Sequence, residues 1–259
     1  HYDPVLLSRI VAKINDTSCT PLDRVQLLSE QMLLARSGVT STSSLIELLG
    51  SYAHETEESV WTMISLTINE LKRFTENDIT AQKQLKSFAR SIAIDQYNYL
   101  GWVPVAGESE SQSKRRSIVM GLMLYAEDHD AIENAVRVFM NHTLEEIEPE
   151  LRPHVLSAVI NHSHDDSTVT ALFNLYRTSP SAELRNDLSI ALCSSRDPVF
   201  TQQILAALLD AKYVRQQDIR HWVVRLLQNP VSRELTWSWL RSNWKWIETK
   251  FKGDKSYDD

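Results

Sequence analysis

Apolar side chains recur every three to four positions through most of this chain, which is the spacing of one face of an α-helix. The strict alternation that is typical of half-buried strands is almost absent. The fold is therefore predicted to be all-α, with about a dozen helices of ordinary length. The clearest apolar stripes are Val25, Leu28, Met32 and Ala35; Trp61, Ile64, Ile68 and Leu71; Leu85, Phe88 and Ile92; Val169, Leu172, Phe173 and Tyr176; and Ile219, Trp222, Val223 and Leu226.

Prolines mark several expected helix starts, because a proline in the first turn loses no intrahelical hydrogen bond. The last four of these prolines are separated by 31, 18 and 32 residues. A spacing near 32 encloses two short helices, which is the size of one helical-hairpin repeat. We therefore expect a curved solenoid of antiparallel helix pairs, a HEAT/armadillo-like superhelix. The five dipeptides are Thr20-Pro21, Glu148-Pro149, Ser179-Pro180, Asp197-Pro198 and Asn229-Pro230.

One segment interrupts the helical pattern. Residues 101–112 contain Pro104, Gly107 and a polar Glu-Ser-Glu-Ser run, which predicts a loop. We expect this loop to connect a first helical layer, about residues 4–100, to a second layer, about residues 111–251. We expect both layers to belong to a single domain over residues 1–259, and a domain boundary at the loop is the alternative. The polar tail, Lys252–Asp259, is expected to be frayed.

The last apolar stripe predicts a terminal helix that is packed on the rest of the domain. Its residues are spaced at i, i+3, i+7, i+10 and i+14, and two further tryptophans widen the apolar face. An exposed interface is the alternative interpretation of this stripe. The stripe consists of Trp237, Leu240, Trp244, Ile247 and Phe251, and the two flanking tryptophans are Trp239 and Trp246.

Composition and charge narrow the possible partners. The hydrophobic fraction of 42% and the charged fraction of 24% are typical of globular proteins. A net charge of −7 argues against non-specific nucleic-acid binding, which depends on Lys and Arg neutralising phosphates. No apolar run is long enough to span a membrane. The two cysteines, Cys19 and Cys193, are expected to be reduced thiols, as in a cytoplasmic protein. The chain starts at His1 without an initiator Met, so we expect a fragment.

Four groups of residues, none of them catalytic, stand in a fixed order along the chain. In this order and spacing they resemble the C-terminal helical domain of the aminopeptidase N family of zinc metallopeptidases, of the bacterial type and truncated at both ends. We call these groups the four landmarks. They are Asp23-Arg24, Leu27-Leu28 and Ala35-Arg36 to Gly38; Glu55-Thr56-Glu57 with Trp61; Leu100-Gly101-Trp102 with Gly107-Glu108-Ser109; and Asn229-Pro230 with Trp239 and Asn243-Trp244.

The resemblance implies a role without chemistry of its own. In that family the helical domain caps the catalytic domain, encloses a chamber over the zinc and restricts access to short or unfolded peptides. The expected partners are the chain's own catalytic domain and peptide substrates, and not nucleic acid or a membrane. The family's zinc motif is H-E-x-x-H, whereas residues 54–58 read His-Glu-Thr-Glu-Glu, so the second imidazole is missing. We expect no cofactor in this chain and zinc in the parent enzyme. Glu55-Thr56-Glu57 is expected to cap the helix that carries Trp61.

Two histidine and aspartate clusters offer metal-competent side chains. They are Asp128-His129-Asp130 and residues 162–166, His-Ser-His-Asp-Asp. An all-helical phosphohydrolase using them is one alternative function, although both clusters fall at helix junctions, where such residues commonly serve as caps. An independent HEAT-like scaffold for protein interactions is the other alternative.

The resemblance singles out one candidate site residue, Arg116. The pair Arg116-Ser117 matches an Arg-Ser pair that, in some mammalian relatives, faces the interior cavity and contacts the C-terminal end of the peptide. An arginine suits this role, because its planar guanidinium can hold a carboxylate through two hydrogen bonds. Lys114 and Arg115 stand where those relatives have apolar residues, so a solvated basic face is the other interpretation of this segment.

Overall fold

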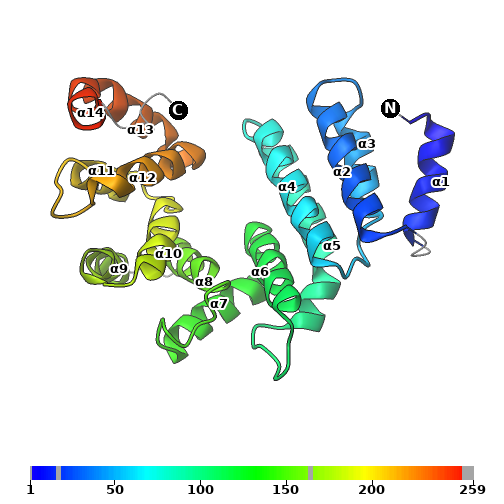
Figure 1. Ribbon diagram of the computed structural model, residues 1–259, viewed down its shortest axis with the longest axis horizontal. Helices are drawn as coiled ribbons and strands as arrows, with labels where there is room; N and C mark the ends of the chain where they lie inside the picture. The colour runs from blue at the N-terminus through cyan, green and yellow to red at the C-terminus, as the bar shows by residue number, and fades with distance from the viewer. Residues whose placement is uncertain (1, 16–18, 163–165, 253–259) are drawn as a thin grey trace. The chain divides into compact units, whose positions relative to one another are not determined.

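The computed structural model describes residues 2–15, 19–162 and 166–252. Within these ranges the regular elements are fourteen α-helices, and no residue lies in a strand, which confirms the all-α prediction (Figure 1). The chain divides into two compact units, residues 1–137 and 138–259.

In the first unit, α4 occupies the centre and packs against α2, α5 and α6 (Figure 1). Its predicted stripe faces inward: Trp61, Ile64 and Ile68 are fully buried. Burying one such side chain contributes roughly 1.5–3 kcal/mol. The helices that begin in this unit are α1 (Pro4–Asn15), α2 (Pro21–Arg36), α3 (Thr42–Gly50), α4 (Glu58–Thr75), α5 (Ile79–Leu100), α6 (Glu110–Tyr125) and α7 (His129–Asn141), which ends in the second unit.

In the second unit, α10 packs against α8, α9 and α12, and α13 packs against α11, α12 and α14. Trp222 lies at the centre of this core, and the ring of Tyr176 meets it edge-on with centroids 4.9 Å apart. Such aromatic pairs add stability beyond the area that they bury. The helices are α8 (Arg152–His162), α9 (Asp166–Thr178), α10 (Ala182–Cys193), α11 (Pro198–Ala207), α12 (Gln216–Gln228), α13 (Pro230–Ser242) and α14 (Trp244–Phe251).

Three of the five predicted proline starts are correct. Helices α2, α11 and α13 begin at Pro21, Pro198 and Pro230, each after a residue whose side chain caps the helix. The other two helices begin later, because Ser181 rather than Ser179 caps α10, and residues 149–151 form a turn before α8.

The predicted loop is shorter than expected. Helix α6 begins at Glu110, because Ser109 and Gln112 form a capping box in which each side chain bonds the backbone of the other residue. The loop between α5 and α6 therefore covers residues 101–109. Gly101 has a φ of 59°, a conformation that favours glycine.

The prediction of one packed terminal helix is wrong, because the helix is interrupted at Asn243, between α13 and α14. The i, i+7 spacing assumes a continuous helix, and the break removes its regularity. Trp237 and Trp244, two members of the predicted stripe, are 52% and 53% exposed. The side chains that pack on the core of the second unit are instead those of Trp239, Trp246 and Phe251.

Candidate functional site

The residues at the incomplete zinc motif form a structural tie. The carboxylate of Glu55 is buried and binds the guanidinium of Arg24 through two bonds, Nε–Oε2 at 2.8 Å and Nη2–Oε1 at 3.1 Å. Its Oε1 also accepts the N–H groups of Thr56 and Glu57, both at 2.8 Å. His54 is exposed and lies on the surface. Glu55 is thus fully engaged by donors and is not placed to activate water.

The predicted cap is therefore only partly right. Glu57 occupies the N-cap position of α4 but makes no side-chain cap hydrogen bond. The carboxylate of Glu55 instead satisfies the amides just before the helix. It orders the approach to α4 rather than the first turn of α4 itself.

The same tie joins the first two landmarks. Arg24 also donates to the carbonyl of Cys19 at 2.7 Å, and the hydroxyl of Tyr52 donates to the carbonyl of Arg24 at 3.0 Å. The indole of Trp61 donates to the carbonyl of Glu55 at 3.0 Å. The starts of α2 and α4 are thereby held together.

The cluster at residues 128–130 also has a structural role. Asp128 accepts the N–H of Ala131 at 3.0 Å and forms an ion pair with Arg90 at 2.7 Å. Asp130 accepts the hydroxyl of Tyr97 at 2.6 Å. Burial raises the pKa of Tyr97 to about 12, and its bond to Asp130 acts in the same direction.

Metal ligation finds no support in the part of the chain that the structure describes. Across residues 2–15, 19–162 and 166–252, no group of three or more His, Cys, Asp or Glu side chains is placed to hold a metal ion. The central residues of the other predicted cluster, 163–165, lie outside the described residues.

Arg116, the predicted substrate contact, lies at the third landmark and is 1% exposed. Its Nε donates to the carbonyl of Gly101 at 2.9 Å, and its Nη2 pairs with Oε2 of Glu108 at 2.7 Å and contacts the carbonyl of Leu100 at 3.3 Å. The guanidinium thus joins both ends of the loop to α6. Arg115 is also buried, which differs from the solvated basic face that the sequence suggested as the other interpretation.

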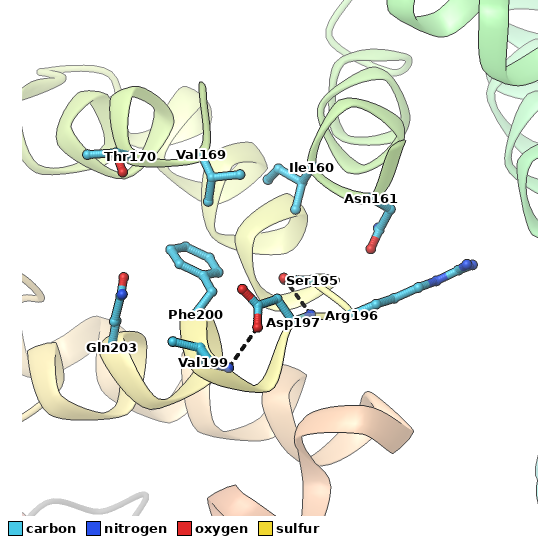
Figure 2. A pocket seen from close by; sticks show the side chains of 10 residues that line it. All are labelled: Ile160, Asn161, Val169, Thr170, Ser195, Arg196, Asp197, Val199, Phe200 and Gln203. Atoms are coloured by element: carbon cyan, nitrogen blue, oxygen red, sulfur yellow. Dashed lines mark hydrogen bonds between the residues drawn. The ribbon is translucent and has the colours of Figure 1, made fainter. Parts of the chain in front are cut away.

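The loop and Arg116 line a surface cavity of about 320 Å³. A larger cavity, about 480 Å³, lies in the second unit among α8, α9 and α11. Figure 2 shows Ile160, Val169 and Phe200 around its apolar part, while the side chain of Arg196 extends away from it. The carboxylate of Asp197 is already used there, since it caps α11 by accepting the N–H of Val199 at 2.8 Å (Figure 2).

The fourth landmark likewise links segments that are distant in sequence. The side-chain amide of Asn229 donates to the carbonyls of Cys193 and Ser195 at 2.9 and 2.8 Å, and its oxygen caps α13. Each of the four landmarks therefore contributes to helix packing or to a helix end.

Two features were not predicted from the sequence. Arg152 pairs with Asp187 at 2.9 Å. Three arginines line a small pocket: Arg185 of α10, Arg225 of α12 and Arg215, the residue just before α12. An arginine at the start of an apolar helix was the only sequence signal for the first, and its acidic partner lies 35 positions away along the chain.

None of the helices that the structure describes is long and apolar enough to cross a membrane.

Comparison with known proteins places the chain in a family. Two of the relatives are aminopeptidase N of Lactobacillus delbrueckii subsp. lactis, 27% identical over 258 residues, and aminopeptidase N of Lactococcus lactis subsp. cremoris (strain MG1363), 30% identical over 259 residues. Both alignments cover 99% of this chain and 30% of the relative. Aminopeptidase 2 of Candida albicans is 28% identical over 87% of this chain and 25% of its own length.

The chain thus spans less than a third of the length of these relatives, and the resemblance to aminopeptidase N is confirmed. Residues 1–258 match the ERAP1-like C-terminal domain over almost the whole sequence. The chain belongs to the family of ERAP1-like C-terminal domains.

Proposed function

We propose that this chain is the non-catalytic C-terminal domain of a cytoplasmic zinc aminopeptidase, an enzyme that removes N-terminal residues from peptides. The observation that carries the proposal is the match of residues 1–258 to the domain family, together with relatives named aminopeptidase that are more than three times as long. The engagement of Glu55 by Arg24 supports the same conclusion, because it makes the one zinc-like motif structural.

In the parent enzyme the helices of this domain form a HEAT-like solenoid and act as one domain that caps the catalytic domain. The domain restricts the active-site chamber to short or unfolded peptides. The successive packing of α10 against α8, α9 and α12 supports this architecture, because repeat units bury their apolar faces on neighbouring units.

The chain itself provides the first test. After dialysis, metal analysis should find no equivalent of bound zinc, and an aminoacyl-anilide assay should show no turnover. Retained zinc, or turnover that survives repurification, would contradict the non-catalytic role.

Parentage is tested in the gene. We expect the reading frame upstream of the His1 codon to encode H-E-x-x-H followed by a distal Glu. An initiator Met codon directly before His1 would instead favour the independent scaffold.

Arg116 is proposed to help position the C-terminal carboxylate of peptides in the full-length enzyme. Its place on the wall of the 320 Å³ cavity supports the idea. Glu108 already pairs with its guanidinium, so an incoming carboxylate must share or replace that contact.

Changing the substrate rather than the loop tests this role without disturbing the fold. In the full-length enzyme, amidating the C-terminus of a peptide should raise KM by roughly tenfold, since a charged hydrogen bond contributes about 1.5 kcal/mol or more. Glu108→Gln should lower KM for the free peptide while leaving aminoacyl-anilides unaffected, because these have no C-terminal carboxylate. Equal KM values for the peptide and its amide would contradict the substrate contact. The role of Arg116 would then be limited to holding the loop against α6.

A further inference from the structure

A third cavity, about 210 Å³, lies in the second unit between α10 and α12, and the proposed function does not use it. Three arginines line its wall: Arg185 comes from α10, Arg225 from α12, and Arg215 from the position just before α12. The single carboxylate on the wall belongs to Asp218. The lining thus carries three guanidinium groups against one carboxylate, in a chain whose net charge is −7.

Asp218 neutralises only one of these arginines. Its Oδ2 accepts from Nε of Arg215 at 3.1 Å and from the hydroxyl of Tyr176 at 3.3 Å. Tyr176 in turn accepts the indole N–H of the buried Trp222 at 3.1 Å. This chain of hydrogen bonds fixes Asp218 and Arg215 to the core of the unit.

The other two arginines bind only neutral groups among the residues that the structure describes. Arg225 donates to the hydroxyl of Ser189 and, at 2.7 Å, to the side-chain oxygen of Asn186. Arg185 donates through Nη1 to the carbonyl of Ser179. Its Nε is buried without a hydrogen-bond partner in the described part of the chain. Two positive charges therefore face the pocket without a carboxylate of their own.

We propose that this pocket binds one oxyanion group, a carboxylate or a phosphate. The guanidinium group matches both, because its planar array of donors can meet two oxygens of the same anion. Arg225 is held in place by α10, so little side-chain freedom remains to be lost on binding. A small cavity with an excess of one charge also concentrates counter-ions of the opposite sign. A volume of about 210 Å³ fits a single acidic group.

Binding is measured by calorimetry on the 259-residue chain, with inorganic phosphate, acetate, tri-alanine and tri-alanine amide as probes at constant ionic strength. We expect saturable binding of one anion per chain. Arg185→Gln and Arg225→Gln should each weaken binding by roughly tenfold, which corresponds to the loss of one charged hydrogen bond. Arg241→Gln is the matched control, because it removes the same charge from an exposed position of the same unit and should leave the affinity unchanged.

Asp218→Asn separates loss of the site from loss of the fold. Removing the only carboxylate on the wall should tighten binding several-fold, a gain that a misfolded variant cannot produce. Saturable phosphate binding without acetate binding assigns the site to phosphates, and binding of tri-alanine but not of its amide assigns it to carboxylates. The proposal is overturned if no probe shows saturable binding, or if tri-alanine and its amide are the only probes that bind and they bind equally. It is also overturned if Arg241→Gln weakens anion binding as much as Arg225→Gln does, or if Asp218→Asn fails to tighten anion binding. Because binding is read without catalysis, failure here leaves the aminopeptidase proposal untouched.

Discussion

Arg24 and Glu55 form a buried ion pair with two parallel hydrogen bonds, although 31 positions separate them along the chain. Both charged groups are shielded from water. Their charged forms are therefore stabilised only by each other and by the carbonyl and amide groups around them. The pair holds the start of α2 against the start of α4. It is the clearest case in which one landmark of the sequence exists to contact another.

Removing one partner of this pair should therefore be costly. We expect Arg24→Met to lower the free energy of unfolding by about 3–5 kcal/mol, because Glu55 is left charged and buried without compensation. Urea denaturation measures the change. Arg36→Met is the matched control: its side chain is 60% exposed, Glu70 lies 3.5 Å away, and the expected loss is below about 1 kcal/mol. Similar losses in the two variants would show that the buried pair has no special role.

Lys72 should make stability depend on pH in the alkaline range. Burial lowers the pKa of Lys72 to about 8 from an ordinary 10.5. Between these two values the unfolded chain binds more protons than the folded chain, so the free energy of unfolding rises with pH. Lys72→Met should remove this rise, which is on the order of 3 kcal/mol, and should stabilise the chain at neutral pH.

The measurement is a series of urea titrations from pH 7 to pH 10.5 on both proteins. Subtracting the variant's curve cancels the titration of groups that the substitution leaves alone. A difference that is flat across this range would contradict the lowered pKa of Lys72.

The two cysteines should differ in reactivity. Burial raises the pKa of the Cys193 thiol to about 12, so almost no thiolate is present near neutral pH, whereas Cys19 is partly exposed. At pH 8 an aromatic disulfide reagent should label Cys19 in the native chain and both thiols in urea. Cys19→Ser should abolish native labelling. Rapid labelling of Cys193 in that variant would mean that the core of the second unit unfolds locally at low cost in free energy.

The terminal tryptophans should divide into two classes. Trp239 packs against Trp246 with ring centroids 6.3 Å apart, and Trp239→Ala should cost roughly 2 kcal/mol. Trp244 is 53% exposed, and Trp244→Ala should change stability by less than about 0.5 kcal/mol. Thermal unfolding of the two variants compares them directly. A larger loss of stability for Trp244→Ala than for Trp239→Ala would contradict this division and favour the continuous packed helix that the sequence predicted.

The helices were largely predictable because their cause is local. The spacing from Trp61 to Leu71 reports one helix face, and this face is buried. The break at Asn243 was not predictable from spacing, because the apolar stripe continues across it. There the side-chain amide and the backbone N–H of Asn243 both donate to the carbonyl of Trp239, at 2.9 and 3.0 Å.

The candidate site was harder to predict than the helices. Spacing within a helix says nothing about which distant residue a buried arginine will meet, so the partners of Arg24 and Arg152 had to come from the structure. The sequence did identify residues 54–58 as an incomplete zinc motif, since one missing imidazole is a local fact. The contact between Arg116 and a peptide carboxylate stays a prediction.

The ties at the landmarks have a consequence for how such chains are recognised. Two ion pairs, Arg24 with Glu55 and Arg116 with Glu108, stabilise the helical fold. Their presence in a sequence therefore indicates that the helical domain can fold. They carry no information on whether a working peptidase is attached to it. A pseudoenzyme, or a domain separated from its partner by gene fission, would keep the same signature for as long as it folds.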